Sequence, residues 1–239
     1  MWHEVDTQSL TPFLIDGVDH TTEYREDNVT EIYNALHALG YSNNAIAAMC
    51  GNSQFEGLLN PAQKEAWTQG PTWSITTDGG GLFGWTPVSY PGDTYLRHLY
   101  EWCSANNLTW NTGPAQMAYV NYELTDWNNA ERFTQNLQAV LMTYPGTTTA
   151  YPVIPPITAS QFITSTLSVE VLSDYWILYY EHPGDVTDAN SGYLPRRQAA
   201  LQWKTFIDNL SPTPPGPTPR TYKKMPIYLM LRNNLYRRF

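Results

Sequence analysis

One stretch of the chain, residues 51–61, places a single carboxylate at the point where a predicted helix ends. It reads Gly-Asn-Ser-Gln-Phe-Glu-Gly-Leu-Leu-Asn-Pro. Apolar and small side chains recur at helical spacing over residues 42–55, which predicts a helix with one buried face. Glu56 follows Met49 by seven residues, so it lies near the edge of that face. The glycine and the Asn-Pro pair that follow Glu56 then end the helix.

A carboxylate in this position is a candidate general acid. Among Phe55, Leu58 and Leu59, the side chain of Glu56 is expected to be partly removed from water. Desolvation favours the neutral, protonated form of a carboxyl group, which is the form that donates a proton. A glutamate at a helix end is more often an ordinary solvated surface residue, so this stretch alone leaves both interpretations open.

A glycine-rich block follows at residues 78–87, with the sequence Asp-Gly-Gly-Gly-Leu-Phe-Gly-Trp-Thr-Pro. Three consecutive glycines between a polar and an apolar run indicate a tight hairpin or a close approach of main chain. Because glycines have no side chains, such a segment leaves room for a polymer beside the backbone. Trp67, Trp73 and Trp85 are able to stack on sugar rings, although core packing is the commoner role of any single tryptophan.

These two blocks resemble the phage tail lysozyme family, a lysozyme-like, wall-degrading domain carried on virion tails. The resemblance continues at residues 116–124, 179–183 and 196–203, and it covers residues 28–210. Gly57 departs from the family, which usually has serine after the catalytic glutamate, and His182 stands where arginine or lysine is frequent. The resemblance implies an α+β, mainly helical fold with a small β lobe and an active-site cleft between the lobes.

The same resemblance implies that the protein cleaves the β-1,4 bond of peptidoglycan between N-acetylmuramic acid and N-acetylglucosamine. Glu56 would protonate the leaving oxygen, and the second carboxylate of a glycosidase is assigned first to Asp78 and less strongly to Asp93. The residues expected to contact the substrate all belong to the two blocks or the segment between them: Gln54, Trp73, Gly80, Gly81, Phe83 and Trp85.

Two other functions remain open at this point. A lytic transglycosylase would cut the same bond with Glu56 alone, using a group of the substrate as the attacking nucleophile. A tail structural protein would use the fold only to bind the wall or a virion partner. Glu123 and Glu181 match family positions, but buried pairing with Arg196, or a helix cap, is the expected role of both.

The remaining chemistry-bearing residues point to no cofactor and no metal. The five histidines are scattered, without the paired spacing of a zinc site. Cys50 and Cys103 fall within helical patterns, so we expect reduced, unreactive core thiols and no disulfide. The net charge of −9 argues against a nucleic-acid partner. No apolar run reaches the length of a membrane span.

The chain divides into four predicted segments. Residues 1–27 form an irregular arm, and its apolar side chains available for docking onto a neighbour are Trp2, Phe13, Leu14 and Ile15. Residues 28–210 form the catalytic domain, and residues 211–219, with five prolines, form a stiff linker. Within the domain, helices are predicted at residues 28–39, 42–55, 94–106, 114–124, 129–142, 160–180 and 195–210, and a β-containing lobe at residues 60–93.

The last segment, residues 220–239, holds six of the 13 basic residues and no acid. Its mixture of basic and apolar side chains predicts docking to another tail protein, with attraction to an anionic wall or membrane surface as the alternative. A functionless tail is the simplest explanation. The first residues lack a secretory signal, which fits synthesis in the host cytoplasm, and the resemblance implies a place at the phage tail tip.

Overall fold

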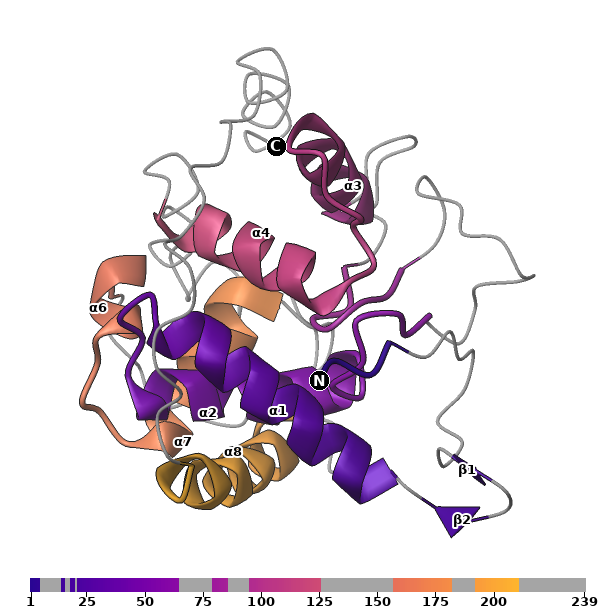
Figure 1. Ribbon diagram of the computed structural model, residues 1–239. Coiled ribbons are helices and arrows are strands. Elements are labelled where there is room, and N and C mark those ends of the chain that lie inside the picture. The colour runs from indigo at the N-terminus through magenta and orange to yellow at the C-terminus, as the bar shows by residue number, and fades with distance from the viewer. Residues whose placement is uncertain are drawn as a thin grey trace, which may run out of the picture.

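The computed structural model describes residues 1–4, 14–15, 18–19, 21–64, 79–85, 95–125, 157–181 and 192–210. This part of the chain is mainly helical (Figure 1). The elements in chain order are β1 (Leu14–Ile15), β2 (Val18–Asp19), α1 (Thr21–His37), α2 (Asn43–Glu56), α3 (Tyr95–Ala105), α4 (Gly113–Thr125), α6 (Ala159–Ile163), α7 (Val169–Trp176), the π-helical η2 (Ile177–Glu181) and α8 (Tyr193–Asp208). The strands β1 and β2 pair antiparallel.

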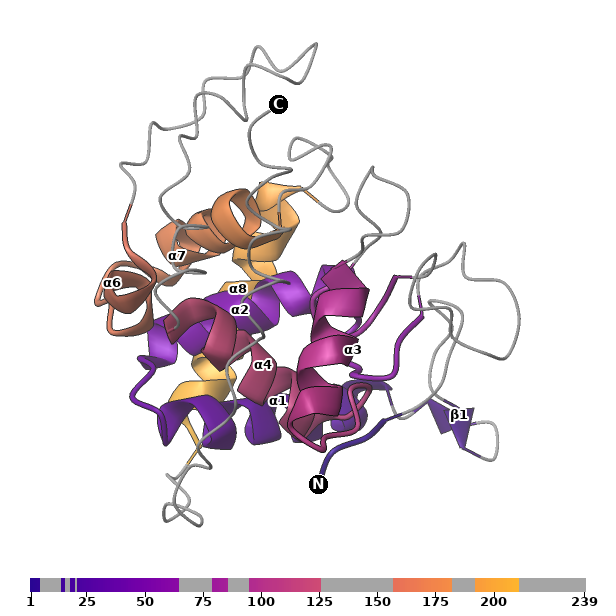
Figure 2. The same cartoon turned by 90° about the horizontal axis from the view of Figure 1, so that it is seen from above.

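The central element is α2, which packs on α8, α7 and α1 (Figures 1 and 2). Its middle, from Ala45 to Ser53, is buried at every position. Small side chains make that possible, since a Cβ atom on Gly51 would lie 2.6 Å from the backbone nitrogen of Ala200 in α8. The Ser42 hydroxyl accepts a hydrogen bond from the Ala45 amide at 3.1 Å and caps the helix. The predicted helix at 42–55 is therefore confirmed.

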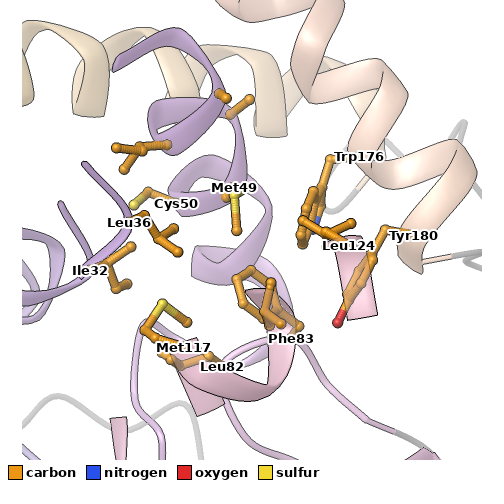
Figure 3. Close-up of a cluster of buried hydrophobic side chains, with 14 of the residues drawn as sticks. Ile32, Leu36, Met49, Cys50, Leu82, Phe83, Met117, Leu124, Trp176 and Tyr180 are labelled. Atoms are coloured by element: carbon orange, nitrogen blue, oxygen red, sulfur yellow. The ribbon is translucent and has the colours of Figure 1, made fainter. Parts of the chain in front are cut away.

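The hydrophobic core forms where α1, α2, α4, α7 and the segment 82–83 meet (Figure 3). Met49 of α2 projects into it, and Trp176 and Tyr180 stack there with ring centroids 4.1 Å apart. Cys50 and Cys103 are free and fully buried, as predicted. The core side chains labelled in Figure 3 are Ile32, Leu36, Met49, Cys50, Leu82, Phe83, Met117, Leu124, Trp176 and Tyr180.

The predicted start of the first helix at Asn28 is wrong, because α1 begins at Thr21. Asn28 is fully buried and its side chain is used in tertiary contacts rather than as a cap. Its amide nitrogen donates to the carbonyl of Leu59 at 2.8 Å, and its oxygen accepts from the amide of His3 at 2.7 Å. Asparagine fits a helix start and a buried tertiary bond equally well, and local sequence does not separate them.

The first residues of the chain pack on the helical body. The ring of Trp2 occupies the space beside Gly113, where an added Cβ atom would lie 2.2 Å from it. The Gly113 amide donates to the carboxylate of Glu4 at 2.9 Å. Trp2 is therefore committed to its own domain, which corrects the expectation that it docks onto a neighbour.

The single helix predicted at residues 160–180 is also wrong, because the structure breaks it into α6, α7 and η2. Thr158 and Gln161 form a capping box at the start of α6, and the Ser168 hydroxyl caps α7. Hydroxyl side chains compete with the helical ladder for backbone groups, which explains the interruption. The predictions at 94–106, 114–124 and 195–210 correspond to α3, α4 and α8.

Several predicted regions lie partly or wholly outside the described residues, among them the linker at 211–219 and the last segment at 220–239. The helix at 129–142 falls outside them completely. Of the β-containing lobe at 60–93, only residues 60–64 and 79–85 are described, and they hold the isolated bridges Lys64–Gly80 and Gly80–Trp85. None of the described helices is both long enough and apolar enough to cross a membrane.

Candidate active site

Glu56 is the last residue of α2, and its side chain is 21% exposed. The Gly57 amide donates to the Ser53 carbonyl at 2.9 Å and closes the final helical turn. Leu58 and Leu59 then adopt left-handed backbone angles, with φ of 53° and 61°. Two consecutive non-glycine residues in this conformation are strained, and such strain concentrates at functional sites. The predicted end of the helix at Glu56 is therefore confirmed.

The glycine-rich block forms a tight turn at residues 80–85. The Trp85 amide donates to the Gly80 carbonyl at 2.9 Å, and the Gly80 amide returns a bond to the Trp85 carbonyl at 3.3 Å. The Leu82 amide donates to the Gln116 side chain at 2.9 Å, and the Leu82 carbonyl accepts from the Ser53 hydroxyl at 2.7 Å. These bonds fix the turn against the end of α2.

The contact between the turn and α2 is close enough to exclude side chains at two positions. A Cβ atom on Gly84 would lie 2.7 Å from Oε2 of Glu56, and the φ of Gly84 is 53°. A Cβ atom on Gly57 would lie 2.0 Å from the carbonyl oxygen of Gly81. The departure of Gly57 from the family serine therefore has a physical cause in this chain, because main chain occupies the space of the side chain.

Restoring the family serine at Gly57 should harm this protein. We expect Gly57→Ser to push the turn away from α2 and to lower the free energy of unfolding by about 1–3 kcal/mol, as overpacking does. Thermal melting measures the effect. An unchanged melting temperature would show that the Gly81 carbonyl lies further from Gly57 than described.

Arg196 of α8 binds the carboxylate of Glu56. Its Nη2 donates to Oε1 of Glu56, and its Nη1 donates to the Asn52 side-chain oxygen at 3.3 Å. The Arg196 side chain is only 4% exposed. Glu123 accepts a hydrogen bond from the Tyr180 hydroxyl, and Glu181 accepts one from the Trp176 indole at 2.6 Å. Arg196 is thus the cation at Glu56, a contact that was not predicted, while its pairing with Glu123 or Glu181 stays a prediction.

The residues predicted to contact substrate divide into three groups. The rings of Phe83 and Trp85 are 2% and 3% exposed, so their faces pack in the core and are not free to stack on a sugar. Gly80 and Gly81 are buried within the turn, and Gln54 is half-buried, accepting a hydrogen bond from the Trp203 indole at 2.8 Å. Trp73 and Asp78, like Trp67 and Asp93, lie outside the described residues.

Sequence reasoning overlooked three residues that touch Glu56 or its partner: Asn52, Gly84 and Arg196. Asn52 lies four residues before Glu56 and so shares its helix face, which was a usable signal. Gly84 stands in the block already singled out. The contact of Arg196 with Glu56 spans 140 residues of sequence, and no local pattern indicates it.

The arrangement can transfer a proton at the partly exposed carboxyl group of Glu56. Arg196 holds one oxygen, and the other lies beside the main chain of Gly84. Burial raises the pKa of the Cys50 thiol and raises that of Cys103 to about 12, so neither supplies a thiolate nucleophile at neutral pH. Within the described part of the chain, no three His, Cys, Asp or Glu side chains gather as metal ligands would.

The family model described as Phage tail lysozyme matches residues 27–207. The matched range contains α2, the turn at 80–85 and all of α8 except its last residue, and therefore Glu56, Gly84 and Arg196. A comparison with curated proteins finds no significant match.

Proposed function

Since this chain belongs to the phage tail lysozyme family, we propose that it is a tail-associated peptidoglycan hydrolase. It cuts the β-1,4 bond between N-acetylmuramic acid and N-acetylglucosamine, and so opens the bacterial wall as the phage infects its host. The observation that carries this proposal is the placement of Glu56. Its partly exposed carboxyl group stands at a helix end, with one oxygen held by a buried cation and the other beside glycine main chain.

In the proposed reaction, protonated Glu56 donates its proton to the glycosidic oxygen. The bond between that oxygen and the anomeric carbon of the muramic acid breaks, and the departing sugar leaves with the proton as its new hydroxyl group. Positive charge develops on the ring that remains, in an oxocarbenium-like transition state. Water then forms a bond to the anomeric carbon and gives its extra proton to a carboxylate, which returns the site to its starting state. A general acid accelerates the cleavage of such a bond by about 10²–10⁴-fold.

We assign the second carboxylate to Asp78. It directly precedes Gly79 in the sequence, and the residues that follow form the turn packed against Glu56. In a glycosidase the second carboxylate acts either as a base for water or as a nucleophile. The second candidate, Asp93, lies further along the chain from that turn.

The replacement Asp78→Asn should therefore lower the rate of wall cleavage by about 10²-fold or more, the usual effect of a lost catalytic base. Binding to wall fragments, measured by co-sedimentation, should stay at the wild-type level because asparagine keeps the shape of the side chain. Asp93→Asn is the matched control and should leave the rate unchanged. A loss of rate in Asp93→Asn with a wild-type rate in Asp78→Asn would assign the second carboxylate to Asp93.

The proposed activity is tested by clearing of purified walls. We expect the wild-type protein to reduce the turbidity of at least one wall type and to release soluble muropeptides. A protein that binds walls of several chemical types but clears none of them would instead be a tail structural protein. That outcome would remove the catalytic function while leaving the family assignment in place.

The proposed partners are peptidoglycan and another protein of the phage tail. We place the tail contact in residues 220–239, where basic side chains surround an apolar stretch at 225–231. The alternative site, the arm at residues 1–27, is weakened by the contact of Trp2 with its own domain. A chain ending at Pro219 tests this assignment, because it should keep its activity on wall fragments and be missing from assembled particles.

A further inference from the structure

A buried cation beside a proposed general acid requires an explanation. Only 4% of the Arg196 side chain is exposed, while Glu56 is 21% exposed. Removing a guanidinium from water is costly, so a buried arginine at this carboxyl group indicates a role beyond filling space in the core.

The surroundings of Arg196 indicate that it is held rigidly. Its Nη1 donates to both the backbone and the side-chain oxygen of Asn52, at 3.4 and 3.3 Å. Asn52 in turn donates to the Ser173 hydroxyl at 3.1 Å and to the Ala48 carbonyl at 2.9 Å. The guanidinium also lies over the ring of Phe55, 5.6 Å from its centroid.

This chain of contacts links three helices. Ser173 belongs to α7, Asn52 and Glu56 belong to α2, and Arg196 belongs to α8. Asn52 and Ser173 are buried, so water does not compete for their hydrogen bonds. The position of the guanidinium is consequently set by the helix packing itself and not by a flexible surface contact.

The chemistry of the guanidinium then decides which oxygen of Glu56 can carry the proton. Arginine only donates hydrogen bonds, so the oxygen that it contacts must act as an acceptor. That oxygen is Oε1. In the protonated acid the hydrogen is therefore on Oε2, the oxygen that lies beside the main chain of Gly84.

We propose that Arg196 is a positioning residue, which rests on the proposed hydrolase function and deepens it. Through Asn52 and Ser173, it fixes the carboxyl group of Glu56 so that Oε2 carries the transferable proton toward the scissile bond. Misplacing a catalytic group by about 1 Å costs on the order of 10²-fold in rate.

The test compares Arg196→Met with Arg196→Lys in the clearing of purified walls, over a range of wall concentrations. We expect Arg196→Met to lower the maximal rate by on the order of 10²-fold, with the half-saturating wall concentration unchanged. Arg196→Lys should recover part of the rate, because lysine still donates to Glu56 but lacks the fork that also reaches Asn52. Arg97→Met, which removes the ion pair with Glu101 within α3, is the control and should behave as wild type.

A folded Arg196→Met protein that keeps the wild-type maximal rate would overturn the positioning role. If that variant does not fold, Asn52→Leu decides, since it leaves Arg196 beside Glu56 and keeps the backbone contact but removes the side-chain oxygen of Asn52 and its link to Ser173. It should lower the maximal rate by about tenfold without changing half-saturation, and an unchanged rate would overturn the proposal. Absence of clearing by the wild-type protein is a separate result, which would overturn the hydrolase function itself.

Discussion

Replacement of Glu56 by glutamine should reduce the clearing of purified walls by about 10²–10⁴-fold, the contribution of a general acid. Glutamine has the size and shape of glutamate, and its amide oxygen can still accept the hydrogen bond from Arg196. The variant lacks only the proton that the reaction needs. Circular dichroism should therefore show the wild-type fold, and the loss should appear in the rate of cleavage and not in wall binding.

Glu101→Gln is the matched control for this change. Glu101 also accepts a hydrogen bond from an arginine, since Arg97 donates to it at 2.7 Å, but that pair lies within α3. The control should clear walls at the wild-type rate. If the Glu56→Gln variant clears walls at the wild-type rate, another group supplies the proton.

The second large effect concerns stability and the ion pair between Arg197 and Asp174. Arg197 donates from Nε to one oxygen of Asp174 at 2.7 Å and from Nη2 to the other, while the Asp174 side chain is only 3% exposed. Arg197→Met would leave this carboxylate buried without its cation. We expect a loss of about 3–5 kcal/mol in the free energy of unfolding, measured by chemical denaturation.

The effect of Arg197→Met should depend on pH. Burial raises the pKa of Asp174 above its ordinary value of 3.8, against the lowering effect of Arg197. The folded protein therefore takes up a proton at Asp174 at a higher pH than the unfolded chain does, and removal of Arg197 strengthens this difference. The difference in the free energy of unfolding between Arg197→Met and the wild type should be largest at neutral pH. It should become smaller as the pH falls toward the raised pKa of Asp174.

A double replacement separates the buried charge from the packing. Asp174→Leu combined with Arg197→Met removes both charges and should recover much of the lost stability. An apolar pair of similar volume can replace a buried ion pair without lowering the free energy of unfolding. Failure of the double variant to recover would show that the stability depends on the packing of these side chains and not on the unpaired charge.

The features of this fold that were predictable from sequence depend on local signals. The helix ending at Glu56 combines regular apolar spacing with a serine cap at Ser42, and both signals lie within the helix itself. The turn at 80–85 is indicated by its glycines, two of which, Gly81 and Gly84, adopt the positive φ that glycine favours. In these cases local sequence and tertiary packing favour the same structure.

The errors arose where tertiary contacts decide between local alternatives. Asn28 fits a helix cap, yet it lies within α1, and its side chain forms hydrogen bonds with the backbone of Leu59 and of His3. The apolar pattern at 160–180 continues through the break between α6 and α7, because both helices bury their apolar faces in one core. The pairing of Arg196 with Glu56 depends on how α8 packs against α2, which no spacing within either helix reveals.

The most direct test of the central claim is mass spectrometry of the fragments that the protein releases from purified walls. Hydrolysis by Glu56 predicts glycan fragments that end in reducible N-acetylmuramic acid, present in wild-type digests and absent from those of Glu56→Gln. Fragments ending in anhydromuramic acid would contradict hydrolysis and assign a lytic transglycosylase. Intact glycan strands with cut peptides would contradict glycosidic cleavage altogether.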